Sequence, residues 1–367
     1  MNSVYTGNIT LSLFGESHGK TIGIVMDGLP PGFKIDENYI KLEMNRRKPG
    51  QNKMSTPRKE SDSAEIVSGL FNGCTTGAPL CGLIYTGDTK SKDYGELVEK
   101  MRPGHSDYSG AIHYRNHNDY RGGGHFSGRL TAPLVFAGSI CKQYLRDMGI
   151  TIGSHILKIH NVEDRSFLME DLTQEKLELL RHKTLPVIAD SDSLGVEERM
   201  EACILEARKE KDSVGGIVEC VAIGLPAGWG NPFFHSIESE MASLLFSIPA
   251  VKGVSFGAGF EIVDLFGSEA NDAFQMENNS IVTKTNHNGG ILGGITNGMP
   301  IICKVAIKPT PSISKAQETI NRVTMENTIL TIEGRHDSCI IPRAIPVVES
   351  AVAITLFNAY LEDKKWS

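Results

Sequence analysis

The sequence predicts an α/β (α+β) protein in which helices and short strands alternate along the chain. Apolar residues recur about every 3.6 positions in the predicted helices and alternate in the predicted strands. No stretch has the composition of an interdomain linker, so residues 1–367 are expected to form a single domain. Residues 160–200 are more polar than their surroundings and are the expected peripheral insertion.

Strands are expected where apolar residues alternate or β-branched residues gather. Ile9, Leu11 and Leu13 alternate towards Gly15, and residues 21–26 form the expected partner strand. Further strands are predicted over residues 216–224, 254–264 and 301–308. Helical spacing is found over residues 36–47, 130–147, 171–182, 196–211, 236–247 and 345–361.

Three residues mark the expected starts of helices. Asp36 and Ser236 are expected N-caps, because their side-chain oxygens can accept hydrogen bonds from the free N–H groups of a first turn. Pro342 is expected to open the C-terminal helix, since proline is well tolerated there.

Two six-residue segments resemble each other. Gly28–Phe33 reads GLPPGF and Gly224–Trp229 reads GLPAGW, and each follows a predicted strand and precedes a predicted helix. The pair indicates a duplicated strand–turn–helix unit. The alternative is shared turn chemistry, because glycine and proline are common in such turns.

The composition is that of a globular protein, with 40% hydrophobic and 22% charged residues. The apolar runs are shorter than the roughly 18 residues of a membrane span, so no membrane association is expected. The N-terminus lacks the basic and apolar regions of a secretory signal. The seven cysteines are odd in number and contain no Cys-x-x-Cys pair, which favours a cytoplasmic protein with free thiols.

The charge distribution favours a small anionic ligand over nucleic acid. The net charge is −7, which does not suit a nucleic-acid-binding protein. Cationic residues nevertheless gather at Arg46, Arg47, Lys48, Lys53, Arg58 and Lys59, and again at Arg102, Arg115, Arg121 and Arg129. The alternative is an ordinary solvated face, but Pro49, Gly50 and Pro57 interrupt the first run and prevent a regular charged helix.

The 38 glycines gather in blocks, and the first block, residues 15–23, places Ser17 and His18 after a strand. Its Gly-Lys-Thr ending suggests a nucleotide-binding Walker A loop. That loop needs four residues between its glycines and a following helix, whereas here three intervene and a β-branched stretch follows. A Walker A loop is therefore excluded, and a surface histidine remains the alternative to a functional one.

The second motif places Arg102 and His105 around a Pro-Gly turn. Arginine can hold phosphate or carboxylate through two hydrogen bonds, and histidine can transfer protons near neutral pH. A metal site would have to use His18, His105, Asp107 and His336. No two of these share helical i, i+4 spacing, so no metal is expected.

A third glycine block, residues 121–129, leads into the helix predicted near Leu130. A glycine-rich loop that feeds a helix presents free N–H groups to an anion. The spacing does not fit Gly-x-Gly-x-x-Gly, which argues against a Rossmann oxidoreductase.

Nine motifs, taken in order, resemble the chorismate synthase family from about residue 8 to residue 357. They are GESHG from residue 15, RRKPGQ from 46, RKESD from 58, SGLFNGCTTGAPL from 68, RPGHSDY from 102, YRGGG from 120, SIPAVKGVSFGAGF from 247, NHNGGILGGITNGMPI from 286 and GRHDSCIIPRAIPVVES from 334. The resemblance implies a helical core between antiparallel sheets with internal pseudo-symmetry, assembled as a homotetramer. It also implies the anti-1,4-elimination of phosphate from 5-enolpyruvylshikimate 3-phosphate, which gives chorismate in the shikimate pathway of aromatic amino acid biosynthesis.

The same resemblance assigns roles to residues. The substrate carries a phosphate and two carboxylates, which Arg47, Arg102, Arg129 and Arg335 are expected to hold. Reduced flavin mononucleotide (FMN) would lend electron density for carbon–oxygen cleavage without net redox change. His18 would protonate the departing phosphate and His105 would serve the N1–C2=O edge of the flavin. Asp337, with Ser17 or Ser127, would complete a proton relay around flavin N5.

The resemblance also locates the cofactor positions. Those for FMN are His125, Phe126, Ser127, Pro249, Ala250, Gly293, Lys308, Pro309, Thr310, Pro311, Ser312 and Arg335, and those for NADPH, a possible reductant, are Arg47 and Lys53. Lys53 stands where the family has arginine, and His125, Phe126 and Leu130 replace an arginine, a serine and a glutamate of the family pattern. No flavin-reductase domain is seen in the sequence, so an external reductase is expected.

Two rival functions use parts of the same pattern. A phosphate- or nucleotide-binding module would need only the glycine loops and arginines, but it has no use for titrating groups such as His18, His105 and Asp337. A metal-dependent phosphohydrolase would lose its activity to chelators.

Overall fold

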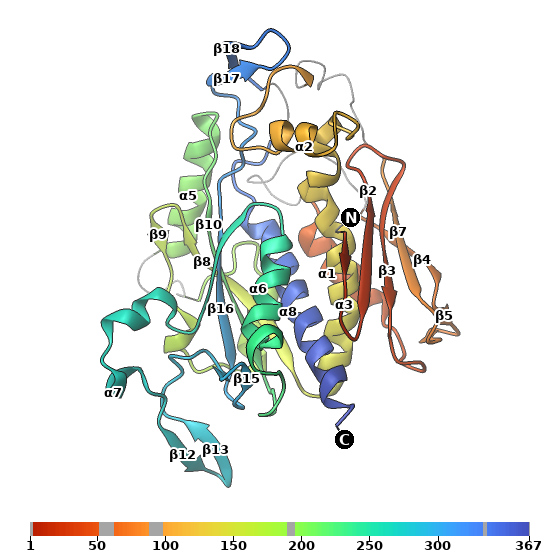
Figure 1. Ribbon diagram of the computed structural model, residues 1–367. Helices are drawn as coiled ribbons and strands as arrows, with labels where there is room; N and C mark the ends of the chain where they lie inside the picture. The colour runs from red at the N-terminus through yellow and green to blue at the C-terminus, as the bar shows by residue number, and fades with distance from the viewer. Residues whose placement is uncertain (1–2, 51–61, 88–97, 189–194, 333–335, 367) are drawn as a thin grey trace.

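Two five-stranded antiparallel sheets enclose a layer of helices (Figure 1). The computed structural model describes residues 3–50, 62–87, 98–188, 195–332 and 336–366. The first sheet has the order β1 (Val4–Tyr5), β2 (Thr10–Gly15), β3 (Thr21–Asp27), β7 (Leu80–Tyr85) and β4 (Ala64–Ser68). The second has the order β11 (Val251–Phe256), β16 (Ile301–Ile307), β10 (Gly216–Ile223), β8 (Thr151–Ile159) and β9 (Val162–Glu163). The predicted class, a helical core between antiparallel sheets, is confirmed.

The helical layer consists of α1 (Glu37–Arg47), α3 (Thr131–Asp147), α6 (Ile237–Ser247) and α8 (Ile341–Asp363). Helices α3 and α8 cross closely, because a Cβ on Gly138 would lie 2.2 Å from the Cβ of Ser350. Helix α8 is apolar and long enough to cross a membrane, but 78% of its most apolar window is buried inside the protein. It therefore forms the centre of the core.

Smaller elements surround these three layers. Helix α2 (Asp107–His113) and the hairpin of β17 (Gln317–Asn321) and β18 (Glu326–Leu330) lie at one end, and α7 (Gly267–Ala270) with β12 (Phe274–Glu277) and β13 (Ser280–Thr283) lies at the other (Figure 1). The remaining elements are β5 (Leu70–Phe71), β6 (Cys74–Thr75), α4 (Gln174–Arg181), α5 (Val196–Lys209), β14 (Ile291–Leu292), β15 (Ile295–Thr296) and the 3₁₀ helices η2 (Arg121–Phe126), η3 (Gly128–Leu130), η4 (Phe167–Met169), η5 (Phe233–His235) and η6 (Gly259–Asp264).

The two halves of the chain share one topology. The first half runs β2, β3, α1, β4, β7, α3 and the second runs β8, β10, α6, β11, β16, α8. Their strands also take matching places in the two sheets, β2-β3-β7-β4 and β8-β10-β16-β11. A small hairpin precedes the last strand of each half in the chain: β5–β6 lies between β4 and β7, and β14–β15 lies between β11 and β16.

The two similar turn segments occupy equivalent places in these halves. Thr75 Oγ1 donates a hydrogen bond to the Pro30 carbonyl at 2.7 Å, and Thr296 Oγ1 donates one to the Pro226 carbonyl at 2.7 Å. Both threonines end the second strand of the small hairpin. The expected internal pseudo-symmetry therefore extends to individual hydrogen bonds, and shared turn chemistry alone does not explain it.

Most predicted elements are confirmed, including both N-caps. The Asp36 carboxylate accepts the N–H groups of Asn38 and Tyr39, and Ser236 Oγ accepts the N–H of Ser239 at 3.1 Å. Gly15 ends β2 and Thr21 begins β3, so the Gly-Lys-Thr segment leads into a strand and forms no Walker A loop.

Two expectations about the second half were wrong in part. The strand predicted over 254–264 runs from Val251 to Phe256 and gives way to η6, because Gly257 and Gly259 have positive φ angles of 56° and 64° that end the extended backbone. The described part of residues 160–200 is not simply peripheral, because Arg181 reaches the helical core.

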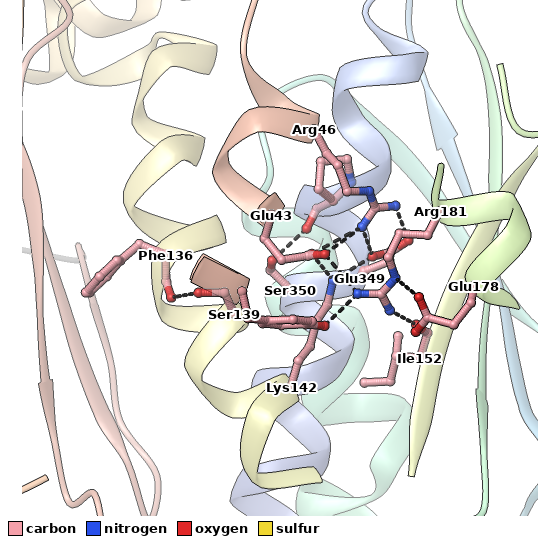
Figure 2. Close-up of polar contacts among 12 residues, drawn as sticks. Glu43, Arg46, Phe136, Ser139, Lys142, Ile152, Glu178, Arg181, Glu349 and Ser350 are labelled. Carbon is pink, nitrogen blue, oxygen red and sulfur yellow. Dashed lines mark hydrogen bonds and ion pairs between the residues drawn. The ribbon is translucent and has the colours of Figure 1, made fainter. Parts of the chain in front are cut away.

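Five charged side chains form a buried network in the helical layer (Figure 2). Arg46 Nη1 lies 2.6 Å from Glu349 Oε2, and Lys142 contacts both Glu43 and Glu349. Arg181 Nη1 approaches Glu43 Oε1 at 2.9 Å. The network thus joins α1, α3 and α8 to the end of α4.

The network depends on keeping both glutamates ionised. Burial alone would raise the pKa of Glu43 and Glu349, but the surrounding cations outweigh it and hold both pKa values below the usual range. Removing one member of such a group leaves an uncompensated buried charge, which is far more costly than losing an exposed pair.

Glu349→Gln should lower the free energy of unfolding by about 3–5 kcal/mol, because Arg46 and Lys142 lose a buried counter-ion. Denaturant titration at neutral pH measures the loss. Glu362→Gln, which breaks the exposed contact with Lys365, is the control and should change stability by about 0.5 kcal/mol or less. A loss below about 1 kcal/mol for Glu349→Gln would contradict a stabilising role of the network.

The same variant has a predicted pH signature. Because the pKa values are depressed in the folded state, the stabilisation is present above the ordinary glutamate pKa of 4.5 and is lost as the pH falls through the folded-state values. Stability of the wild type should therefore fall more steeply below pH 4.5 than that of Glu349→Gln. If the stabilities of the wild type and Glu349→Gln fall equally below pH 4.5, the ionised Glu349 carboxylate does not stabilise the folded protein.

Candidate active site

A cavity of about 620 Å³ lies where both halves of the chain meet. Its wall includes Arg47 at the end of α1, the glycine-rich loop before α3, the end of α6 and the first turns of α8. The segments 246–252 and 308–312 complete it. A cavity of this size is typical of sites for small molecules and cofactors.

The glycine triplet of this loop brings two predicted histidines together. Gly122, Gly123 and Gly124 have φ angles of 59°, 86° and 56°, which favour glycine. A Cβ on Gly122 would lie 2.6 Å from His18 Nε2, and a Cβ on Gly123 would lie 3.3 Å from His105 Nε2. The absence of side chains at these positions therefore lets both imidazoles approach the same loop.

The predicted serines lie on either side of this triplet. The N–H of Ser17 donates to the Gly124 carbonyl at 3.1 Å, and Ser17 Oγ would lie 2.9 Å from a Cβ on Gly122. Ser127 lines the cavity and its Oγ accepts the N–H of Arg129 at 3.3 Å. Ser127 thus follows the loop directly in the chain, whereas Ser17, from the segment after β2, contacts the loop in space.

Two of the expected substrate arginines share a buried carboxylate. Arg47 Nη1 lies 2.5 Å from Asp62 Oδ2, and Arg129 Nη1 contacts Asp62 Oδ1. All three side chains are buried. Burial opposes ionisation of Asp62, but the two guanidiniums outweigh it and hold its pKa below the usual range. Asp62 was present in the RKESD motif but was not predicted as a site residue.

The third arginine and the second histidine share another carboxylate. Arg102 Nε and Nη2 lie 2.7 Å from the two oxygens of Asp107, and His105 Nδ1 lies 2.7 Å from Asp107 Oδ1. Arg102 Nη1 also donates to Ser312 Oγ at 3.2 Å. Asp107 was considered in the sequence only as a metal ligand.

Asp337 pairs with a residue that the sequence did not single out. Arg343 Nη1 lies 2.5 Å from Asp337 Oδ2, and Arg343 Nε donates to the Arg47 carbonyl at 3.0 Å. One partner of Asp337 thus lies on α8, outside the loop of its sequence neighbours Arg335 and His336. Both Asp337 and Arg343 line the cavity.

His125 and Phe126, which differ from the family pattern, each contact a neighbouring segment of the chain. His125 Nδ1 lies 2.8 Å from the Gly15 carbonyl, so it must donate there, and Nε2 accepts from Ser3 Oγ at 2.6 Å. Phe126 packs beneath α2, where a Cβ on Gly110 would lie 2.6 Å from its ring. His125 therefore ties the cavity wall to the N-terminal strands.

The expected cofactor positions are mostly brought together. His125, Phe126, Ser127, Pro249, Ala250, Lys308, Thr310, Pro311 and Ser312 line the cavity, and Pro309 lies between lining residues. Gly293 does not line the cavity. It lies in the β14–β15 turn, beside the first residues of α6. The cavity instead meets the last residues of α6, about 16 Å along the helix. Arg335 and Lys53 lie outside the described residues.

The basic cluster expected around residue 46 divides between two environments. Arg46 points into the buried network and Arg47 points into the cavity. Arg121 pairs with Asp119 and is partly exposed. The expectation that this run as a whole faces an anion was therefore wrong for Arg46, since successive helical residues point in directions about 100° apart.

The lining residues fit an anionic, partly apolar ligand such as a flavin. Thr310 Oγ1 is buried and has no hydrogen-bond partner among the described residues, which leaves it available to a ligand. Lys252 and Lys308 add cationic groups beside the apolar Pro249 and Ile248. Within the described part of the chain, no group of three or more His, Cys, Asp or Glu side chains could hold a metal ion.

Comparisons with known proteins point to one family. The protein-family model described as chorismate synthase matches residues 9–361. The chorismate synthase of Thermococcus gammatolerans is 47% identical over 358 residues, which cover 98% of this chain and 97% of that protein. The chorismate synthase of Methanocaldococcus jannaschii is 46% identical over 367 residues, which cover 98% and 96%. A solved structure titled "Crystal Structure of Chorismate Synthase" superposes with a TM-score of 0.73 at 30% identity, covering 97% of this chain and 92% of that one.

The shared carboxylate of Arg47 and Arg129 yields a prediction. Asp62→Asn should lower the melting temperature, because two buried guanidiniums lose a common counter-ion. Added inorganic phosphate should stabilise this variant more than the wild type, since the anion takes the place of the carboxylate. Thermal melts with and without phosphate measure both effects.

The control is Asp212→Asn, which breaks the exposed contact with Lys315 at 2.8 Å. It should melt like the wild type and respond equally to phosphate. Equal phosphate responses of Asp62→Asn and the wild type would show that Asp62 does not occupy an anion position.

Proposed function

This chain belongs to the chorismate synthase family, and on that premise we propose that it is a carbon–oxygen lyase of the shikimate pathway, which converts 5-enolpyruvylshikimate 3-phosphate to chorismate and phosphate. The single observation that best supports this proposal is the cavity itself, where arginines, His105 and Asp337 from distant segments converge, with His18 against Gly122 of its wall. Such a set suits a polyanionic substrate that must also exchange protons.

The arginines would bind the substrate. Arg47 and Arg129 lie within reach of one carboxylate, that of Asp62, so one phosphate or carboxylate group of a ligand can meet both guanidiniums. Arg102 keeps Nη1 towards Ser312 on the cavity wall while Asp107 holds its other nitrogens. We assign Arg335 as the fourth arginine that binds the anionic groups of the substrate.

The family requires reduced flavin, and we propose FMN as the form bound here. When bound, it supplies transient electron density for breaking the carbon–oxygen bond. His125, Phe126, Ser127 and the segments 249–250 and 308–312 would hold it, with Thr310 Oγ1 as an available hydrogen-bonding group. Gly293 and Arg335 remain family-based assignments.

The titrating residues would move protons. His18, beside Gly122, would protonate the departing phosphate, and His105, beside Gly123, would present its Nε2 to the flavin edge. Asp337 would accept a proton, with Ser17 or Ser127 relaying it. Excluding water from the cavity strengthens each of these electrostatic effects.

Several assembly properties belong to the same proposal. The large exposed aromatic residues Phe233, Phe234, Phe260, Phe266 and Phe274, all at least 60% exposed, lie on and around η5, η6, α7 and β12 and support a homotetramer, because such surfaces usually mark interfaces. We further propose a single-domain cytoplasmic enzyme that receives its reduced FMN from an external reductase. We assign the NADPH-binding positions of the family to Arg47 and Lys53.

An anaerobic assay tests the function directly. The purified protein, given 5-enolpyruvylshikimate 3-phosphate and chemically reduced FMN, should release phosphate and chorismate in equal amounts. His18→Ala should release them about 10²- to 10⁴-fold more slowly, the usual effect of a lost general acid. Phosphate release without chorismate, or equal activity without flavin, would reject the proposal in favour of a hydrolase.

The role of Asp337 can be separated from its ion pair with Arg343. Asp337→Asn should bind substrate and flavin nearly normally but turn over about 10²- to 10⁴-fold more slowly, because an amide cannot accept the proton. Single-turnover phosphate release and flavin titration measure the two effects.

Arg343→Gln is the matched control, because it breaks the same contact but keeps the carboxylate. It should retain most of the single-turnover rate at saturating substrate. If both variants lose the same share of the rate, the ion pair explains the effect and Asp337 is not the proton acceptor.

A further inference from the structure

We propose that Asp107 is a positioning residue that fixes His105 in one tautomer, with Nδ1–H directed to the carboxylate and Nε2 directed to the glycine loop of the cavity. His105 Nδ1 lies 2.7 Å from Asp107 Oδ1, and both side chains are largely buried. Nε2 is the ring nitrogen beside Gly123. The tautomer is a property of the ligand-free protein, and only its effect on turnover rests on the proposed function.

The carboxylate is itself held in place. Asp107 Oδ2 accepts the backbone N–H of Arg102 at 3.1 Å and its Nε at 2.7 Å, while Oδ1 accepts Nη2 at 2.7 Å. A two-pronged arginine contact of this kind fixes the plane of the carboxylate as well as its position. Asp107 is therefore a rigid acceptor for the imidazole.

The charge of Asp107 determines which nitrogen of His105 carries the proton. Burial opposes ionisation, but hydrogen bonds from His105 and Arg102 outweigh it and hold the pKa of Asp107 well below its usual range. An ionised carboxylate can only accept, so a neutral His105 must place its proton on Nδ1. Nε2 is then the atom free to accept or return a proton at the cavity.

Other charged groups near His105 do not replace this interaction. Arg102 faces the carboxylate, and Lys308 Nζ contacts the Gly104 carbonyl. Both are cations, so neither can accept a hydrogen bond from Nδ1. Nδ1 also forms a hydrogen bond of 3.4 Å with Ser106 Oγ, which is longer than its ion-pair contact of 2.7 Å with the carboxylate. Asp107 is the anionic group that the described structure places in contact with the ring.

The competing interpretation is that Asp107 serves only to anchor Arg102 for substrate binding. In that case its loss should weaken substrate binding and leave the state of His105 unchanged. The two interpretations therefore predict different changes in KM, in kcat and in the imidazole itself.

The tautomer can be measured without activity. Histidine-selective ¹⁵N NMR of the ligand-free protein, with the His105 signals identified by their loss in His105→Gln, should show the Nδ1–H tautomer in the wild type. Asp107→Asn should convert a large share to Nε2–H, because an amide can donate to Nδ1. An Nε2–H tautomer in the wild type would overturn the proposal even if the variant fails to fold.

Kinetics test the consequence for turnover. Asp107→Asn should lower kcat by about 10²-fold with a smaller change in KM, because the imidazole loses the carboxylate that orients it. Asp107→Glu should recover part of the rate, and Asp212→Asn should match the wild type. A raised KM with unchanged kcat would overturn the proposal in favour of an Arg102 anchor.

Failure of the proposed function can be distinguished from failure of the positioning role of Asp107. If the wild type releases no phosphate under any condition, the proposed function is wrong, while the NMR result still decides the tautomer. If the wild type is active and the NMR result is as expected, unchanged kinetics in Asp107→Asn would overturn the positioning role.

Discussion

The buried contact of Arg46 with Glu349 and Glu43 organises the molecule, because it locks the end of α1 against α8 in the middle of the sandwich (Figure 2). With Arg46 turned into the core, the next residue, Arg47, must point away from it and enters the cavity. The Arg47 carbonyl is then available to Arg343. One ionic network thus sets both the packing of the central helices and one wall of the site.

The pseudo-symmetric fold explains why the site lies where it does. Each half contributes a sheet and two central helices, and the cavity forms where the end of α1 and the loop before α3 meet the end of α6 and the start of α8. Helix ends are connected by loops, which can carry glycine, histidine and arginine without disturbing the core. The arginines of the cavity already have carboxylate partners in Asp62, Asp107 and Asp337. These carboxylates compensate the buried positive charges when no anionic ligand is bound.

The sequence predicted the fold well where periodicity is strong and local. The central helices and strands β2, β3, β10 and β16 follow from spacing, and the turn similarity indicated the two equivalent halves. Strands β4, β7 and β8 were not predicted from the residues, because β4 is short and because Gly82 in β7 and the segment Gly153–His155 in β8 interrupt the apolar patterns. The same limit applies to the site: glycine-anchored motifs identified His18, His105 and Arg129, but no local pattern shows that Asp62 lies between two arginines.

The most direct test of this account is a crystal structure of the protein with oxidised FMN and 5-enolpyruvylshikimate 3-phosphate. We expect both ligands in the cavity lined by Ser127, Thr310 and Asp337, with an anionic group of the substrate contacting Arg47 and Arg129. Ligands bound elsewhere would contradict the account. The clearest such result would be density in the neighbouring basic groove, of about 470 Å³, that Lys41, Lys48 and Lys183 line beside α1, with the central cavity empty.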